Sequence, residues 1–253
     1  MTGRGRSRVV VLVKALPQPS KKYGETVCCA GLTEHGEWKR LFPVRFRHLS
    51  GQASFSRWDW VDFRYRRPTT DLRGESCHVF EESISIAGKL APKNLNRLLD
   101  PVFVSSAIEA MDRNSSLALI RPRNTRFLLR KRKEGEIIAE RSAYIRAARQ
   151  ASLFDRELAQ IEPSTYEFYF KFEDGSGKHK YRSGDWETHA MFRRERHSHG
   201  EANALRWMSE VYNDEYPKKG MVFAIGNQAR RPQVWQLLGV IRLDETAQGE
   251  LPF

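Results

Sequence analysis

The chain has 253 residues, of which 40% are hydrophobic and 29% charged, the composition of a folded globular protein. Its formal net charge of +12 favours a polyanionic partner, DNA, RNA or an acidic membrane surface, although a charged shell that only maintains solubility is the alternative. No apolar stretch approaches the roughly 20 residues that a membrane-spanning helix needs, so we expect no membrane partner.

Cysteine is scarce, and its placement predicts a reducing environment. Cys28 and Cys29 are adjacent, and neighbours in a strand project to opposite faces, which makes them poor disulfide partners. Cys77 is isolated, and no Cys-x-x-Cys motif is present to hold zinc. The apolar run Val9–Val13 is too short for a signal peptide. We therefore expect a cytoplasmic protein without a metal or other cofactor.

The first third of the chain is rich in strand signals. Val9–Lys14 is a continuous apolar run typical of a buried strand. A proline-rich loop follows, and its tip presents Lys21, Lys22 and Tyr23. Glu25–Thr33 and Glu37–Phe42 then predict a hairpin around Gly36, with Trp38 and Arg40 on one face of the returning strand.

Residues 45–67 interleave arginines with aromatic residues. Strict alternation would place Val61 and Phe63 on a core face. The opposite face would carry Trp58, Arg64 and Arg66, which is typical of a surface that stacks bases and binds phosphates. A strand covered on both faces is an equally good interpretation.

Strands and short helices alternate through the remainder. Seven basic residues and no acidic residue occur between Arg121 and Lys133, which predicts a strand that faces phosphates. Ser105 or Ser106 is expected to cap a helix that runs to Met111, and Ser198–Glu201 has the spacing of a capping box. Further predicted strands are Cys77–Ile86, Leu117–Ile120, Tyr166–Phe172, Lys178–Tyr181, Met221–Ile225 and Val234–Leu243, and further predicted helices are Lys93–Leu99, Glu136–Leu158, Asp185–Arg196 and Glu201–Tyr212.

These elements predict an α+β protein in four segments. Residues 1–135 would form a β-rich, basic domain, either barrel-like or a strongly bent mixed sheet. Residues 136–162 would form a connecting helix, residues 163–245 a smaller α/β half, and residues 246–253 a flexible tail.

Nucleic-acid binding is the function that this pattern favours, with DNA preferred over RNA and a role in DNA repair, replication or defence against foreign DNA. Arginine suits phosphate contacts because its planar group donates in pairs. The candidate binding residues are Lys21, Lys22, Tyr23, Trp38, Arg40, Arg45, Arg47, Trp58, Arg64, Arg66, Arg121, Arg123, Arg126 and Arg130.

An enzyme acting on nucleic acid is the alternative. Asp185 and Glu187, with His179 nearby, could bind a divalent metal ion and activate water. Glu25 with Glu37 and Lys39 is similar to the carboxylate and Glu-x-Lys arrangement of some nucleases. The structural interpretation of Asp185 and Glu187, as the capped start of a helix, is the stronger one.

Two segments resemble the bacterial sliding-clamp binding peptide. The first is Gln150–Phe154 (QASLF), which overlaps a predicted helix, where packing is the better explanation. The second is the C-terminal Gln248–Phe253 (QGELPF), in which Leu251 and Phe253 would fill an apolar groove and Gln248 would bind its rim. A clamp-recruited interaction module is therefore a third hypothesis.

Two longer runs, Val13–Cys28 (VKALPQPSKKYGETVC) and Gly36–Val44 (GEWKRLFPV), resemble an uncharacterised family of prokaryotic proteins. Asp185–Glu187 and Phe223–Asn227 are similar to the second half of that family. The resemblance covers most of the chain and implies no established activity. Relatives of this kind carry cysteines near 174–179, and their absence here counts against a metal role.

Overall fold

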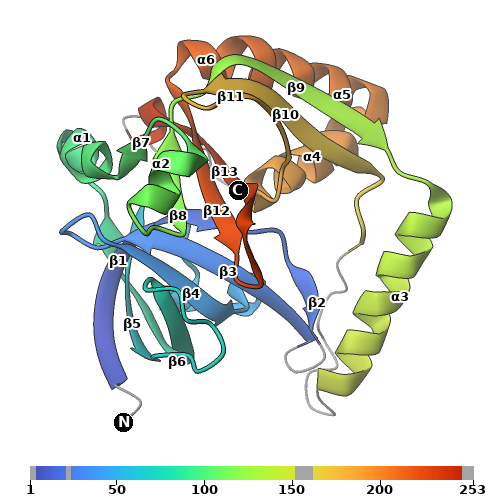
Figure 1. Cartoon of the computed structure of the whole chain (residues 1–253). Coiled ribbons are helices and arrows are strands. Elements are labelled where there is room, and N and C mark those ends of the chain that lie inside the picture. The colour runs from blue at the N-terminus through green and yellow to red at the C-terminus, as the bar shows by residue number, and fades with distance from the viewer. Residues whose placement is uncertain (1–3, 21–23, 152–161, 247–253) are drawn as a thin grey trace.

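The N-terminal half closes into a barrel in the computed structural model, which describes residues 4–20, 24–151 and 162–246 (Figure 1). Each barrel strand pairs with two neighbours, and β3 pairs back onto β1 to close the ring. The barrel strands are β1 (Arg4–Lys14), β3 (Gly24–Leu32), β4 (Trp38–Val44), β5 (Asp59–Arg66) and β6 (Ser76–Lys89), and the short β2 (Gln18–Ser20) extends the sheet beside β3.

The order of the strands around the barrel is that of an OB fold, a five-stranded Greek-key barrel. Taken in chain order as strands one to five, they neighbour one another as 1-2-3-5-4, and the ring closes between 4 and 1. The third and fifth, β4 and β6, run parallel. The prediction of an α+β protein with a barrel-like N-terminal half is confirmed.

Strand β1 is apolar on both faces because both faces are covered. Val9 and Val11 point into the barrel, where they meet Val61 and Phe63 of β5. Alternate residues such as Leu12 point outward into a second core shared with the C-terminal half. This arrangement explains the unbroken apolar run, since a strand buried on one side only would alternate.

A second sheet lies against the outside of the barrel and is also buried on both faces. Leu117 and Leu119 pack toward the barrel, whereas Ala118 and Ile120 pack toward the third layer. The order of its strands is β13 (Arg231–Arg242), β12 (Met221–Gln228), β8 (Leu117–Ile120) and β7 (Phe103–Val104).

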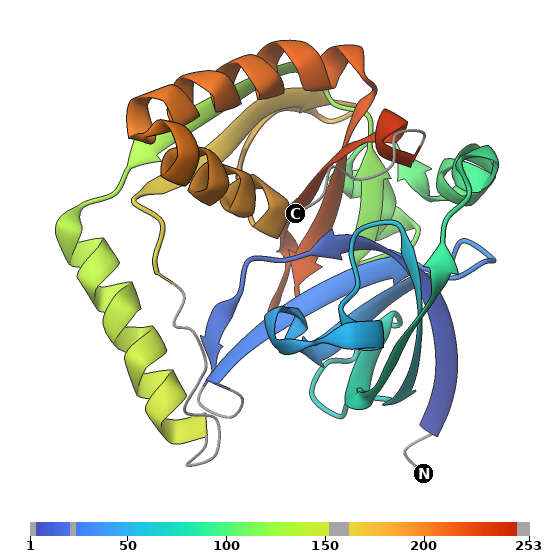
Figure 2. The ribbon, with the colours of Figure 1, turned by 180° about the vertical axis from the view of Figure 1, so that it is seen from behind.

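The third layer is a long curved sheet covered by helices (Figures 1 and 2). Phe127, Phe168 and Phe170 project from it and form an aromatic core with Tyr212. Its strands are β9 (Arg123–Lys131), β10 (Tyr166–Asp174) and β11 (Gly177–Arg182), and the helices of the chain are α1 (Leu95–Leu99), α2 (Ala107–Asp112), α3 (Glu134–Ala151), α4 (Trp186–His199), α5 (Glu201–Glu210) and α6 (Tyr216–Lys218).

Local signals in the sequence have mixed outcomes. The predicted hairpin is confirmed as β3 and β4, with Gly36 at a positive φ of 78°. Ser106 caps α2 by accepting from the Glu109 amide, as predicted. The capping box at residues 198–201 is wrong, because Gly200 is the N-cap of α5 and Glu201 accepts a hydrogen bond from the Tyr166 hydroxyl instead.

A buried ion pair joins the barrel to the C-terminal half. The Asp185 carboxylate is fully buried at the start of α4 and lies 3.3 Å from the Arg57 guanidinium. It also accepts hydrogen bonds from the Thr188 hydroxyl and the Val240 amide. Burial raises the pKa of Asp185 to about 6, because the nearby Arg57 charge offsets only part of the desolvation.

Replacing Asp185 with Asn tests this junction. The variant would remove the fully buried carboxylate charge that pairs with Arg57, so we expect the free energy of unfolding to fall by about 3–5 kcal/mol at pH 7. Urea unfolding followed by circular dichroism measures it, with Asp112→Asn on the exposed end of α2 as the control. A loss below about 1 kcal/mol would show that the ion pair does not hold the two halves together.

Candidate nucleic-acid interface

A cleft of about 1310 Å³ lies between the barrel and the C-terminal half. Its barrel wall is the outer face of β3 and β4, continued by the β1–β3 and β5–β6 connections. The opposite wall is formed by the start of α3, the end of β11 and the β12–β13 hairpin. Residues far apart in sequence therefore meet here, and each wall belongs to a different half of the chain.

The charged side chains of the lining are predominantly basic. Among the described lining residues, the basic ones are Arg40, Arg66, Arg73, Arg132, Lys180 and Arg182, and the acidic ones are Asp71 and Glu140. A cleft with this excess of positive charge and low-dielectric walls concentrates anions.

Strand β4 supplies an exposed aromatic ring to the cleft. Trp38, Arg40 and Phe42 project from the same face of this strand, since they are two residues apart. Trp38 is buried beside β1, whereas Phe42 is 42% exposed and lines the cleft. His78 of β6 is directly opposite Phe42 in the parallel pair and lines the cleft beside it.

Arg40 is held rigidly at the base of this wall. It is only 5% exposed, and its Nη2 donates to the Ser116 carbonyl at 3.0 Å and to the Ser116 hydroxyl. Gly226 leaves room for it, because a Cβ at that position would lie 2.5 Å from the Leu238 side chain and 3.2 Å from Arg40 Nη2. The guanidinium is thus fixed by the neighbouring sheet.

The β5–β6 connection is clamped by a carboxylate. Asp71 accepts from Arg73 at 2.6 Å and from the Ser76 hydroxyl at 2.7 Å. Burial raises the pKa of Asp71, but these hydrogen bonds and the Arg73 charge outweigh it and lower the pKa to about 2. Arg73 also donates to the Asn227 carbonyl of β12 at 2.7 Å, so the connection bridges both walls.

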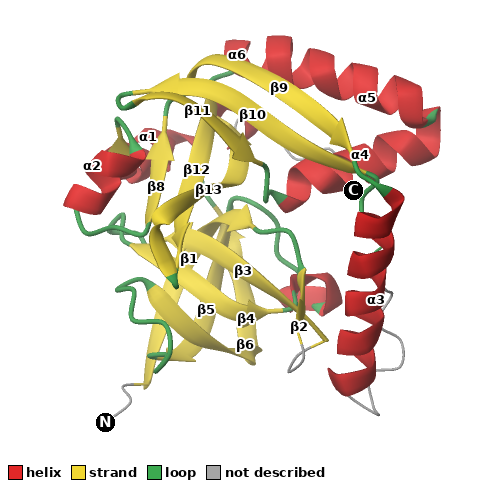
Figure 3. Cartoon of the chain, turned by 45° about the vertical axis from the view of Figure 1, so that its right-hand side comes forward, coloured by secondary structure: helices red, strands yellow, loops and turns green. Residues whose placement is uncertain are grey.

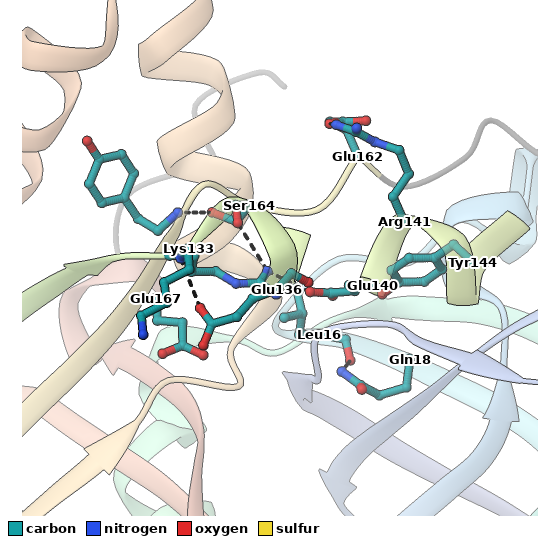
Figure 4. A network of polar contacts seen from close by, with 12 residues as sticks. Leu16, Gln18, Lys133, Glu136, Glu140, Arg141, Tyr144, Glu162, Ser164 and Glu167 are labelled. Carbon is teal, nitrogen blue, oxygen red and sulfur yellow. Dashed lines mark hydrogen bonds and ion pairs between the residues drawn. The ribbon is translucent and has the colours of Figure 1, made fainter. Parts of the chain in front are cut away.

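Helix α3 closes one end of the cleft (Figure 4). Glu140 forms an ion pair with Arg132 at 2.6 Å, and both side chains line the cleft. One turn further along, the Tyr144 hydroxyl donates to the Pro17 carbonyl at 2.6 Å. Figure 4 shows Glu140 and Tyr144 facing the β1–β3 connection, where Leu16 and Gln18 lie. The helix thereby positions that connection.

The predicted catalytic acids Asp185 and Glu187 form ion pairs at the junction between the barrel and the C-terminal half. Asp185 pairs with Arg57, and Glu187 pairs with Lys14 of β1 at 2.7 Å. Burial raises the pKa of Glu187, but the Lys14 and Arg57 charges outweigh it and lower the pKa. The structure supports the interpretation of Asp185 as a helix cap, since it accepts from the Glu187 amide.

His179 lies apart from those acids, in the β10–β11 hairpin. Its Nε2 is 2.9 Å from the Asp174 carboxylate and 3.2 Å from the Ser176 hydroxyl. Because one ring nitrogen makes both contacts, His179 does not bridge Ser176 and Asp174 through its two opposite nitrogens, as the histidine of a catalytic triad does. Within the described residues, no cluster of three His, Cys, Asp or Glu side chains could hold a metal ion.

The aromatic predictions for base stacking require correction. Trp38 is 7% exposed, and Trp58 is 2% exposed at a positive φ of 72° just before β5. Both belong to the core between the barrel and the second sheet, so neither ring is available to a base. Strict alternation failed at Trp58 because the strand begins one residue later, at Asp59.

The predicted arginines divide into several groups. Arg40 and Arg66 line the cleft, and Arg64 lies on the outer face of the barrel, 3.7 Å from Glu82. Arg45 pairs with Glu81, and Arg47 lies over the Trp186 ring. The four predicted arginines between Arg121 and Arg130 lie outside the cleft: Arg121 pairs with Asp100, Arg123 donates to the Asp174 carbonyl, Arg126 is exposed, and Arg130 pairs with Glu167 and Glu136.

Several predicted residues fall outside the described part of the chain. They are Lys21, Lys22 and Tyr23 between β2 and β3, and Gln248, Leu251 and Phe253 at the C-terminus. Most of the internal peptide Gln150–Phe154 is also outside it, as is the side chain of Glu25.

Two family patterns together span nearly the whole chain. Residues 5–101 match the family described as domain of unknown function (DUF8758). Residues 104–251, more than half of the chain, match domain of unknown function (DUF8757). The chain belongs to the DUF8757 family. This confirms the resemblance to an uncharacterised family, and in this DUF8757 protein the cleft is built from both matched regions.

Other comparisons add little to the family assignment. No curated protein matches the sequence. Among solved structures, a chain from a replication protein A heterotrimer bound to ssDNA is similar at 11% identity, covering 98% of this chain and 67% of that chain. Its TM-score of 0.24 supports no inference about function. No helix in the described ranges has the length and apolarity required to cross a bilayer.

Sequence reasoning missed several residues of the cleft. Phe42 follows Trp38 and Arg40 on one face of the predicted strand, so the same alternation could have identified it. Lys180 lies within the predicted strand Lys178–Tyr181 of the second hairpin, and Arg182 directly follows it at the end of β11. No local signal could have brought that hairpin to β4, because the approach depends on long-range packing.

The Asp71 clamp gives a prediction about pH. Because its folded pKa lies below its unfolded value, Asp71 stabilises the protein above about pH 4 and loses this contribution as the pH falls toward 2. Allowing for solvent screening of this half-buried group, we expect Asp71→Asn to lower the free energy of unfolding by about 1 kcal/mol at pH 7.

The difference between wild type and Asp71→Asn should vanish near pH 2, whatever other groups titrate in that range. Urea unfolding of both proteins across this pH range measures it, with the exposed Asp214→Asn as the matched control. A difference independent of pH would show that the carboxylate charge does not clamp the connection.

Proposed function

We propose that this protein binds single-stranded nucleic acid, DNA in preference to RNA, in the cleft between the barrel and the C-terminal half. The observation that carries the proposal is the position of this basic cleft, over β3 and β4 and between the β1–β3 and β5–β6 connections. OB folds bind oligonucleotides on the corresponding face and with the corresponding loops. The fold alone would not suffice, since one fold serves many functions.

The chemistry of the lining supports the proposal independently of the fold. Arg66 and Lys180 bring positive charge from the two walls to a shared volume, where they can contact phosphates. Arg182 lies beside Lys180 and forms an ion pair with Glu167 at 3.1 Å. Phe42 presents an exposed ring on the barrel wall of the cleft, and aromatic rings stack on bases of any sequence. Together they form the combination typical of single-strand binding: a basic groove with a stacking platform.

The wider role in DNA repair, replication or defence follows the expectation from the sequence, and so does a cytoplasmic location. Docking of the C-terminal hexapeptide Gln248–Phe253 on a sliding clamp would bring the cleft to replicating DNA. Clamp pull-down with and without residues 248–253 tests that partner separately.

Phe42→Ala tests the stacking platform. We expect the affinity for a fluorescein-labelled 20-nucleotide DNA to fall by about 1–3 kcal/mol, measured by fluorescence anisotropy at low salt, because one stacked base is lost. Met111→Ala, which removes another exposed apolar side chain from α2 outside the cleft, is the control. Equal affinity of Phe42→Ala and wild type would contradict the assignment of the cleft.

Lys180→Ala tests the phosphate contacts. Losing one contact should reduce the slope of log affinity against log salt by about 0.7 for a single strand, whereas Lys218→Ala on α6 should leave it unchanged. Absence of DNA and RNA binding by the wild type at low salt would overturn the proposal. Shortened oligonucleotide after incubation with Mg²⁺ or Mn²⁺ would favour the nuclease alternative.

A further inference from the structure

Like charges face each other along the β1–β5 pair of the barrel. Arg4 is directly opposite Arg66, and Arg6 is directly opposite Arg64. Directly opposed like charges destabilise a sheet. Two residues further along β1, Arg8 is directly opposite Asp62, and these two side chains attract each other in an ion pair at 2.6 Å. The repulsive pairs are therefore a distinct feature of the end of this ladder.

The opposed arginines have few acidic partners. Of the described acidic side chains, none forms an ion pair with Arg4, Arg6 or Arg66 within 4 Å. Glu82 lies 3.7 Å from Arg64, and both side chains are more than half exposed, so this contact is strongly screened. Repulsion of this kind is relieved when a polyanion binds across it.

This surface is continuous with the cleft. In register, Arg66 is opposite His78 of β6, and His78 is opposite Phe42 of β4. Directly opposed residues project from the same side of a sheet, so one row runs from Phe42 through His78 and Arg66 to Arg4. Phe42, His78 and Arg66 also line the cleft.

A second row lies beside the first on the same outer face. Arg64 of β5 is opposite Phe80 of β6 on one side and Arg6 of β1 on the other. The alternate residues Phe63 and Tyr65 of β5 and Val79 of β6 pack in the barrel core, so the arginines point outward. Strands β1, β5 and β6 form a single side of the barrel in Figures 1 and 3.

We propose that this outer face, the arginine track (Arg4, Arg6, Arg64 and Arg66, with His78 and Phe80), carries the single strand after it leaves the cleft. The inference rests on the proposed function and extends it to a second contact surface. Three strand spacings separate β4 from β1, about 14 Å, which corresponds to about four stacked nucleotides. The phosphates of this segment would lie between the opposed arginines, and Phe80 would offer a further ring.

Oligonucleotide length separates the track from the cleft. A short strand can fill the cleft alone, whereas a longer one also reaches Arg6 and Arg64, which lie outside the cleft lining. We therefore expect Arg6→Ala/Arg64→Ala to bind a 4-nucleotide dT oligomer like the wild type. The same variant should bind a 20-nucleotide dT oligomer about tenfold more weakly, with a salt slope smaller by about 1.4.

Lys93→Ala/Arg97→Ala is the matched control, because it removes two exposed positive charges from the α1 region. Its affinity for both lengths should stay close to that of the wild type. The melting temperature of Arg6→Ala/Arg64→Ala should be at or above that of the wild type, since a repulsive pair is removed. This readout separates a loss of contact from a loss of folding.

Three results would overturn the track. The first is an equal loss of affinity for the 20-nucleotide oligomer in Arg6→Ala/Arg64→Ala and Lys93→Ala/Arg97→Ala, which would reflect net charge alone. The second is an equal loss of affinity for the 4- and 20-nucleotide oligomers in Arg6→Ala/Arg64→Ala, which would place Arg6 and Arg64 in the cleft contact itself. The third is binding to phosphatidylserine vesicles that depends on Arg6 and Arg64, with no length effect on DNA. If the wild type binds neither oligomer, the proposed function fails as well.

Discussion

The carboxylate of Asp185 is the interaction on which the arrangement of the two halves depends. It caps α4, accepts from β13 through Val240, and neutralises Arg57 from the barrel side. A buried charge of this kind tolerates little displacement, because separation of the partners would leave each ion desolvated and unpaired. Beside it, Lys14 and Glu187 form a second ion pair between the same two parts.

The cleft is a consequence of this junction. The second sheet is apolar on both faces, so it must lie between the barrel and the aromatic third layer. The β12–β13 hairpin and β11 then extend beyond the packed region and face the exposed part of β4. Arg73 and Tyr144 fix the two connections at the rim, through Asn227 and Pro17. A binding surface built in this way is preorganised, which lowers the entropic cost of ordering it around a ligand.

Arginine clusters in the sequence were a poor guide to the position of the interface. Arg130 pairs with Glu167 and Arg45 with Glu81, so acids distant in sequence neutralise part of the predicted basic surface. Trp58 illustrates the same difficulty for aromatic residues, since a tryptophan beside arginines has the same local pattern whether it is buried or exposed. Its burial is decided by the second sheet, whose strands begin only at Phe103.

The sequence by itself determined the basic charge, the α+β class, the β-rich first half, the β3–β4 hairpin and the cap of α4, because these follow from composition and from contacts within a few residues. Only the tertiary structure decided the closure of the barrel, the placement of Phe42 opposite the second hairpin, and the row that joins Arg4 to the cleft. Alternation specifies which side of a strand a residue occupies. It does not specify which strand becomes the neighbour, since that choice depends on packing between residues far apart in the chain.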